Sequence, residues 1–412
     1  MSRPPRARPA AAGIVGCIAF ALIGWSGLLV PSLIRSVEDA FDQTDAGLGT
    51  FYLVYAVFYA IGSFGGGILT ERIGRRAVLT AAAMFHGLGL IGLAVAPEWG
   101  VFMLAVVPAG LGAGGLDGGV NGLALDLYRD SRGRALNLLH LFFSLGALTA
   151  PLAVGRLVEA GVDWHLLIEA TGVAALVLAG LFLIVRMPDG RRTAVDGAEP
   201  AGSVGSVSRG ANLRVLLAGP LILLAVAIGC YVASEIGVSN WLVRFLEAQP
   251  LSVATTALAL YWGGLALGRL VSARVSDRFD HVRFAVVASV AMSIALAGAI
   301  LAPSGPLSIA LFAVSGFATG PVYPMIMAIG GDRYPDRSAA VSGLLSGAAV
   351  TGSIVYPPIM GLLSVTVGLT VAMLGTVVLG LACAAALVLV GRMPVRVHGD
   401  RLERDGLPSS VR

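Results

Sequence analysis

The sequence of 412 residues contains no lysine and little charge of any kind. Only 13% of its residues are charged and 57% are hydrophobic, whereas a soluble domain normally carries about 25% charged and 45–50% apolar residues. The mean hydropathy is +0.86. This composition excludes an ordinary soluble enzyme, a nucleic-acid-binding domain and a disordered scaffold. It predicts an all-α protein that crosses a membrane several times.

Cysteine is also scarce, and its spacing argues against two kinds of site. The three cysteines, Cys17, Cys230 and Cys383, lie in separate apolar segments without CxxC or CxxxH spacing. We expect buried apolar side chains rather than a disulfide or a metal site. The chain has no HExxH motif, no G-x-S-x-G motif and no phosphate-binding P-loop. We therefore expect no enzyme activity, no cofactor and no ATP-driven transport by this chain.

Apolar blocks separated by short polar breaks predict twelve transmembrane helices. Each block is about as long as the ~20 residues with which an α-helix crosses the hydrocarbon core. The first apolar run is too long for a signal peptide, so we expect it to be retained as a helix. The predicted helices lie near residues 13–36, 47–69, 77–96, 101–127, 135–158, 166–186, 214–237, 251–273, 284–302, 306–328, 339–362 and 367–391.

The chain repeats itself at an offset of 206 residues, which relates the segment Gly67–Arg72 to Ala273–Arg278. The same offset relates Tyr55 to Tyr261, Gly62 to Gly268, Gly110 to Gly316, Gly114 to Gly320, Gly146 to Gly352, Pro151 to Pro357 and Gly155 to Gly361. One register held over about a hundred residues predicts two six-helix pseudo-repeat halves. The expected parts are a first half at 1–187, a flexible linker at 188–212, a second half at 213–392 and a tail at 393–412.

The arginines predict the orientation, because positively charged loops stay on the cytoplasmic side of a membrane. Of the 28 arginines, 25 fall on one side of the predicted arrangement, with Arg269 among them, and Arg35, Arg156 and Arg244 fall on the other. We expect both termini and the linker in the cytoplasm and the chain in the plasma (inner) membrane. The pI of about 9.2 then reflects topology and not a nucleic-acid partner.

Two acidic residues lie within predicted membrane helices, and both are candidate proton-coupling groups. Asp117 lies in the fourth helix, about 24 Å from its predicted start. A lone carboxylate at that depth costs a few kcal/mol and usually faces a cavity and acts on ions or substrates. Glu235 lies in the seventh helix, nearer its outer end. The alternatives are a fixed hydrogen-bond network for Asp117 and a solvated interfacial acid for Glu235.

Polar and aromatic side chains at similar depth are the candidate substrate-binding residues. Asn137, His140 and Ser144 form one polar stripe on the fifth helix, and Asn121 lies one turn from Asp117. Such a stripe suits a hydroxyl-rich ligand, although polar side chains also hold membrane helices together. The aromatic candidates are Trp25, Tyr231, Tyr261, Trp262 and Tyr323. For each aromatic taken singly, packing is the favoured alternative.

The segment Gly67–Arg76, with the sequence GILTERIGRR, is expected at the cytoplasmic end of the second helix. It predicts a tight glycine contact between helices and a carboxylate–guanidinium latch that closes the cytoplasmic side. The candidate gating residues are Gly67, Glu71, Arg72, Gly74, Arg75, Arg76, Asp277 and Arg278. The alternative is a set of ordinary positive-inside arginines.

This segment resembles the signature loop of the major facilitator superfamily, G-x-L-x-D-R-x-G-R-R, with Glu71 where aspartate is usual. Residues 110–126, 136–140, 146–151 and 320–324 are similar to the fucose permease-like branch of that superfamily. The resemblance implies a proton-coupled sugar transporter whose two halves rock around a midplane site, with Asp117 as the helix 4 carboxylate. Gly27 stands where the branch has a helix 1 carboxylate, and Phe143 where the fucose permease has a polar residue.

The expected function is proton-coupled movement of a small polar solute, sugar or sugar-like, by alternating access. The main alternative is a proton-driven exporter of amphiphilic drugs on the same fold. Such exporters carry an arginine in helix 4, whereas residues 101–125 contain none, and their helix 5 glycine motif is only partly matched by residues 146–155. The expected partners are the solute, protons and the lipid bilayer, and we expect a monomer.

Overall fold

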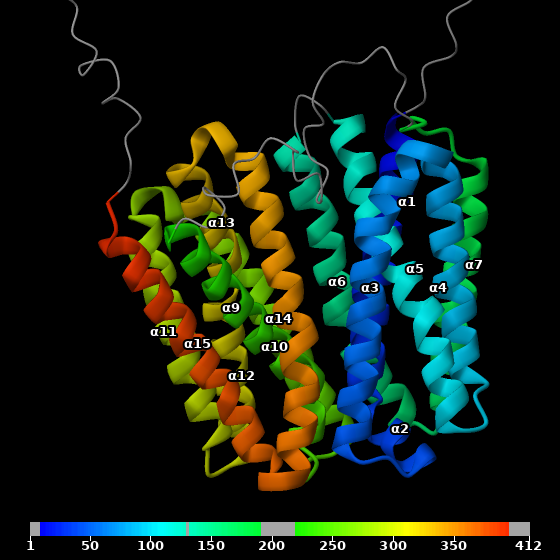
Figure 1. Ribbon diagram of the computed structural model, residues 1–412. Coiled ribbons are helices and arrows are strands. Elements are labelled where there is room, and N and C mark those ends of the chain that lie inside the picture. The colour runs from blue at the N-terminus through cyan, green and yellow to red at the C-terminus, as the bar shows by residue number, and fades with distance from the viewer. Residues whose placement is uncertain (1–8, 129–131, 191–218, 395–412) are drawn as a thin grey trace, which may run out of the picture.

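The computed structural model describes residues 9–128, 132–190 and 219–394 of the chain. These residues form a bundle of α-helices, and no β-strand occurs among them (Figure 1). Twelve helical segments are long and apolar enough to cross a membrane. The prediction of an all-α membrane protein with twelve transmembrane helices is confirmed.

The first half contains six long helices and one short one. The short helix α2 (Ile34–Phe41) connects the first two long helices. The long helices are α1 (Pro9–Ser32), α3 (Asp45–Ile73), α4 (Arg75–Ala94), α5 (Trp99–Leu127), α6 (Arg132–Glu159) and α7 (Trp164–Ile184).

The second half repeats this order, except that its fourth span is broken. Adding the 206-residue offset to α4 gives the bounds of α11, and adding it to α5 gives the joint extent of α12 and α13. The break falls at Gly320 and Pro321, because proline has no N–H group for the helical hydrogen bond. The helices are α9 (Gly219–Phe245), α10 (Leu251–Val275), α11 (His281–Ile300), α12 (Gly305–Thr319), α13 (Val322–Arg333), α14 (Ser338–Val367) and α15 (Leu369–Arg392).

Several predicted helices have different limits in the structure. The first predicted helix, at 13–36, is two helices, α1 and α2, and the tenth, at 306–328, is divided into α12 and α13. The seventh was expected to end at residue 237, but α9 continues to Phe245. Its last two turns carry Asn240 and Arg244, whose polar atoms contact the first half. Hydropathy alone could not predict this extension, because it depends on contacts with distant parts of the chain.

The repeat extends to the glycines that bring helices together. Gly62 on α3 lies so close to α5 that a Cβ atom would overlap the carbonyl oxygen of Leu111. Gly268 on α10 meets the carbonyl oxygen of Phe317 on α12 in the same way, and both residues are related to the first pair by 206 positions. The sequence repeat is therefore a repeat of helix packing.

The bundle has two ends. α1 begins, α7 ends, α9 begins and α15 ends at one of them, at the top of Figure 1, and we call this end the linker side. The short helix α2 lies at the opposite end, which we call the α2 side (Figure 1). The predicted linker at 188–212 and tail at 393–412 lie almost wholly outside the described residues.

Replacing Gly62 by alanine is expected to destabilise the first half by about 1–3 kcal/mol, because the new methyl group forces α3 away from α5. Thermal unfolding of the purified protein in detergent measures the effect as a lower Tm. Gly65→Ala on the same helix is the matched control, since no atom lies within 4 Å of its Cβ position. An equal Tm for the two variants would contradict the packing role of Gly62.

Candidate functional site

Asp117 lies on α5 and forms a polar group with a neighbouring helix. The Asn121 amide donates a hydrogen bond of 3.1 Å to its carboxylate, and the Tyr59 hydroxyl of α3 donates a second. The glycine packing explains this proximity, because a Cβ atom at Gly114 would overlap the backbone of Tyr59. Asp117 and Asn121 both remain partly exposed. The carboxyl group is therefore held by two donors and is still accessible.

Glu235 pairs with Arg269, an arginine that the sequence analysis assigned to the cytoplasmic side. One Arg269 nitrogen lies 3.8 Å from its carboxylate, and the two side chains are 32% and 9% exposed, respectively. Glu235 is thus buried in the bundle and is not a solvated interfacial acid. Arg269 was expected among the positive-inside arginines, but it extends from α10 toward α9 and pairs with an intramembrane acid. The positive-inside rule concerns the number of arginines near helix ends. It does not predict the direction in which a long side chain points.

The predicted polar stripe on α6 is only partly available. Asn137 and His140 are exposed, whereas Ser144 is buried. The Ser144 hydroxyl donates a hydrogen bond of 2.9 Å to the carbonyl oxygen of His140 on its own helix. The His140 ring meets Phe20 edge-on at 5.5 Å. Asn137 and His140 are therefore the members of the stripe that remain accessible.

The predicted aromatic residues differ in their availability. The Trp25 indole N–H donates a hydrogen bond of 3.0 Å to the Thr171 hydroxyl of α7, so its polar atom already has a partner within the first half. Tyr323 is partly exposed, and its ring lies 6.3 Å from that of Tyr231. Tyr261 is fully buried. Trp262 is also buried, and its indole N–H has no partner among the described residues.

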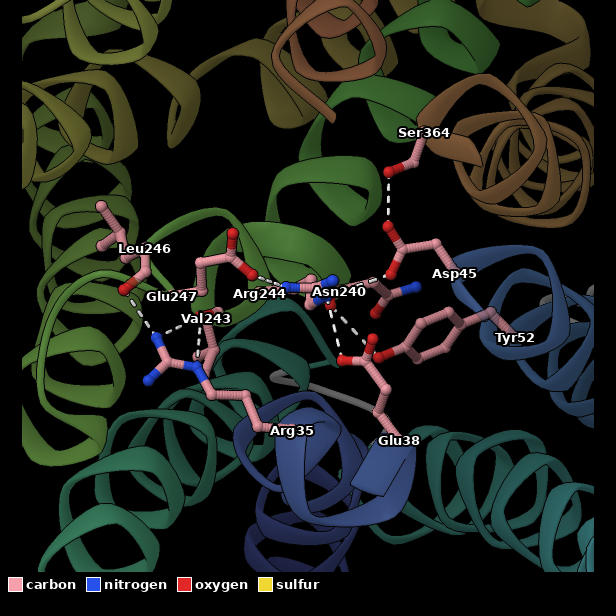
Figure 2. A network of polar contacts seen from close by, with 10 residues as sticks. All are labelled: Arg35, Glu38, Asp45, Tyr52, Asn240, Val243, Arg244, Leu246, Glu247 and Ser364. Atoms are coloured by element: carbon pink, nitrogen blue, oxygen red, sulfur yellow. Dashed lines mark hydrogen bonds and ion pairs between the residues drawn. The ribbon is translucent and has the colours of Figure 1, made fainter. Parts of the chain in front are cut away.

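A polar network on the α2 side joins the two halves, and it was not among the predicted site residues (Figure 2). Arg244 at the end of α9 lies 3.0 Å from Glu38 of α2 and 3.1 Å from Asp45 of α3. Asp45 in turn accepts a hydrogen bond from Ser364 of α14. We call these residues, together with Arg35, the α2-side latch.

Arg35 binds backbone atoms of the other half instead of an acid. Its guanidinium donates to the carbonyl oxygens of Val243, Leu246 and Gln249 at distances of 2.6–2.9 Å. These carbonyls lie at and just beyond the end of α9, where helical partners are missing. The sequence did carry a signal for the latch, since Arg35 and Arg244 are two of the three arginines that break the positive-inside pattern.

The charged groups of the latch are partly removed from water. Burial raises the pKa of the Glu38 carboxyl above its ordinary value, although Arg244 acts in the opposite direction. Burial likewise lowers the pKa of Arg35. At Glu38 the loss of hydration outweighs the attraction to Arg244. Ion pairs of this kind add little net stability, whereas removal of one partner is costly. A contact of this kind can specify one arrangement of the halves without locking it.

Helices α3 and α14 touch on the α2 side and separate toward the linker side. A Cβ atom at Gly49 of α3 would lie 3.1 Å from Pro358 and 3.3 Å from Gly361 of α14. Gly67 and Gly343 lie 18 residues from Gly49 and Gly361, a whole number of helical turns, and so share their faces. Nothing lies within 4 Å of the Cβ positions of Gly67 and Gly343. The tight contact expected of Gly67 is thus not made in this conformation.

The other predicted gating residues lie on the linker side. Arg75 is buried and forms an ion pair of 2.7 Å with Asp126 of α5. Arg76 donates a hydrogen bond of 3.3 Å to the carbonyl oxygen of Val185. Gly74 has a positive φ of 90° between α3 and α4. The partners of both arginines belong to the first half, so these contacts do not join the halves.

Three further gating candidates lie near this loop or at its repeat position. Arg72 and Arg278 are exposed, and Glu71 is partly exposed. The side chain of Asp277 lies outside the described part of the structure. Among the described residues no group of three His, Cys, Asp or Glu could hold a metal ion, and the three cysteines are free.

Comparison with known proteins identifies the family. Residues 14–305 and 248–411 match the sequence family described as Major Facilitator Superfamily. The chain belongs to this superfamily. The expectation from the GILTERIGRR loop is therefore confirmed, and the helices described above are those of a transporter and not of an enzyme.

Three curated relatives show the range of the similarity. The probable 4-methylmuconolactone transporter of Cupriavidus pinatubonensis is 27% identical over 70% of this chain and 67% of its own length. The glucose/galactose transporter of Brucella abortus is 29% identical over 58% of this chain and 59% of its own length. The gentisate transporter of Corynebacterium glutamicum is 25% identical over 90% of this chain and 87% of its own length. The chain thus spans about three fifths of the sugar transporter.

Two solved sugar transporters have the same fold. The D-xylose–proton symporter superposes with a TM-score of 0.74 at 14% identity and covers 94% of this chain and 98% of its own. The fucose:proton symporter of E. coli superposes with a TM-score of 0.59 at 18% identity and covers 92% of this chain and 98% of its own. At identities this low, the superpositions show that the fold is shared and give no information about the substrate.

Replacing Arg244 by glutamine is expected to open the α2 side, because Glu38 and Asp45 would remain partly buried without their counter-charge. The loss of charged hydrogen bonds of about 1.5–3 kcal/mol corresponds to a shift of roughly tenfold or more in the closed-to-open ratio. Spin labels at the exposed Ala160 and Ser304 would report a longer distance between the halves.

Arg156→Gln provides the matched control for this experiment. Arg156 lies on the same side of the bundle, is exposed and donates, among the described residues, to the carbonyl oxygen of Leu152 on its own helix. Unchanged label distances in Arg244→Gln, or equal changes in the two variants, would contradict a gating role for the latch.

Proposed function

We propose that this chain is a proton-coupled secondary transporter of a small polar solute, with Asp117 as the proton-binding group. The observation that carries the proposal is the position of Asp117: a partly exposed carboxyl group inside the bundle, held by Tyr59 and Asn121. An intramembrane acid that is not buried in an ion pair is expected to serve an ion or a substrate. The relatives named as a glucose/galactose transporter and a gentisate transporter support a small polar solute.

The proposed mechanism is alternating access between two rigid halves. The latch joins the halves on the α2 side, while α3 and α14 separate toward the linker side. We take the linker side as cytoplasmic, because most arginines lie there and positive loops remain inside. The conformation described is then inward-facing, and the plasma membrane is the proposed location.

The second conformation would use the same glycine faces at the other end. Closing the linker side would bring Gly67 of α3 against Gly343 of α14, as Gly49 and Gly361 meet on the α2 side. Glycine at all four positions lets two helix backbones approach closely. The signature-loop residues Glu71 and Arg72, with Asp277 and Arg278 of the second half, would then join the halves across the closed cytoplasmic side.

Asp117→Asn is expected to abolish proton-driven accumulation while sparing counterflow exchange, since exchange requires no net proton movement. Proteoliposomes with an imposed pH gradient, tested with labelled galactose and labelled gentisate, measure both activities. Glu98→Gln is the control, because Glu98 is an exposed acid that precedes α5 and makes no side-chain cap hydrogen bond there. Loss of both activities in Asp117→Asn would instead assign Asp117 a structural or ligand-binding role.

Gly67→Leu is expected to hold the chain in the conformation described here, because the side chain would fill the contact that closes the linker side. Transport should be lost while the protein remains folded, and a cysteine at Asn137 should stay reactive toward a soluble thiol reagent. Gly65→Leu on another face of α3 is the control. Normal transport by Gly67→Leu would rule out the proposed closure.

A further inference from the structure

We infer that the solute carries a carboxylate and that Arg269 is the group that binds it. This inference rests on the proposed transport function and defines the substrate class of the same site. It starts from the cost of an arginine inside a membrane bundle. A charged side chain there is expensive and is retained where it acts on an ion or a substrate.

The contact between Arg269 and Glu235 leaves most of the guanidinium unused. Their closest nitrogen and oxygen atoms are 3.8 Å apart, whereas a hydrogen-bonded pair of these groups is about 2.7–2.9 Å apart. Guanidinium offers five N–H donors in a planar fork, and the Arg269 side chain is 32% exposed. Its charge is therefore balanced by Glu235, but its donors remain open to a ligand.

Two further buried side chains of the second half carry donors that make no hydrogen bond of ordinary geometry. The Tyr231 hydroxyl is fully buried against Glu235 and Arg269. The Trp262 indole N–H, on α10 seven residues before Arg269, has no partner among the described residues. A buried donor without a partner costs free energy. A ligand group that only accepts hydrogen bonds would relieve this cost.

A carboxylate fits this arrangement better than a neutral sugar does. An ionised carboxylate accepts hydrogen bonds at both oxygens and matches the guanidinium fork with two parallel bonds. A sugar hydroxyl brings a donor as well as acceptors, and the available acceptor, Glu235, is already beside Arg269. Tyr323 is partly exposed and its ring lies 6.3 Å from that of Tyr231, so it would flank the bound anion.

Glu235 and the solute would compete for one guanidinium. This competition distinguishes a binding role from a structural ion pair. In a structural pair, removing either partner weakens the protein and changes ligand affinity in the same direction. In a binding site, removing Arg269 lowers the affinity for a carboxylate, whereas removing the charge of Glu235 raises it.

The experiment measures binding to the purified full-length chain by calorimetry, with two matched ligand pairs. Galacturonate is compared with galactose, and gentisate with hydroquinone, so that each pair differs mainly in its carboxylate. We expect at least one acid to bind about tenfold or more tightly than its neutral partner. Arg269→Gln should remove this preference, as expected for loss of a charged hydrogen-bonded pair, and Glu235→Gln should increase the affinity for the acid.

Two further variants keep the test decisive. Arg274→Gln is the control, because Arg274 is an exposed arginine on the same helix that donates only to its own backbone. Arg269→Lys retains the charge without the fork and should bind the acid with intermediate affinity. If Arg269→Gln fails to fold, Glu235→Gln and Arg269→Lys still give opposite expected changes.

Several outcomes would overturn the inference. Equal binding of acid and neutral partner, binding of neither acid, or acid binding that Arg269→Gln leaves unchanged would each do so. The proposed function would survive those results if the wild type accumulated galactose under a proton gradient. Conversely, Arg269-dependent binding of an acid without proton-driven accumulation would support the carboxylate site and contradict the proton coupling.

Discussion

A charged group inside a membrane bundle must find a partner, because no bulk water is present to solvate it. This constraint decides where the polar residues of this chain lie. Asp117 is held by Asn121 and a tyrosine hydroxyl, Glu235 lies beside Arg269, and the latch acids surround Arg244. Each group is met by at least one side chain from a different helix, so the polar groups also determine which helices come together.

The two halves can move as units because each is tightly packed internally. Glycines such as Gly62 and Gly268 bring helix backbones into contact at equivalent places in the two halves, and close-packed interiors transmit displacement instead of absorbing it. The contacts between the halves are more varied. They combine partly buried ion pairs, glycine faces that meet at one end, as at Gly49 and Gly361, and apolar side chains of a cluster that spans both halves. The proposed rocking would have to open the polar and glycine contacts on the α2 side.

Much of the fold followed from patterns that are local or repeated. Runs of apolar residues predicted the twelve spans, and the 206-residue offset predicted equivalent helices whose bounds agree in α4 and α11. Asp117 could be selected because an isolated acid in an apolar, glycine-rich segment is unusual. Its hydrogen bond to Asn121 joins residues one turn apart, so helical periodicity sufficed. The Tyr59 contact crosses between helices and was not predicted.

The sequence by itself determined the helical membrane fold, the duplication and the family, because hydropathy, spacing and the signature loop are properties of neighbouring residues. The tertiary structure decided the pairing of Glu235 with Arg269 and the assembly of Arg35, Glu38, Asp45 and Arg244 into one latch. These contacts join positions between 34 and 214 residues apart. Their formation depends on the tilt of whole helices and the reach of long side chains, and neither is encoded in any short stretch of sequence.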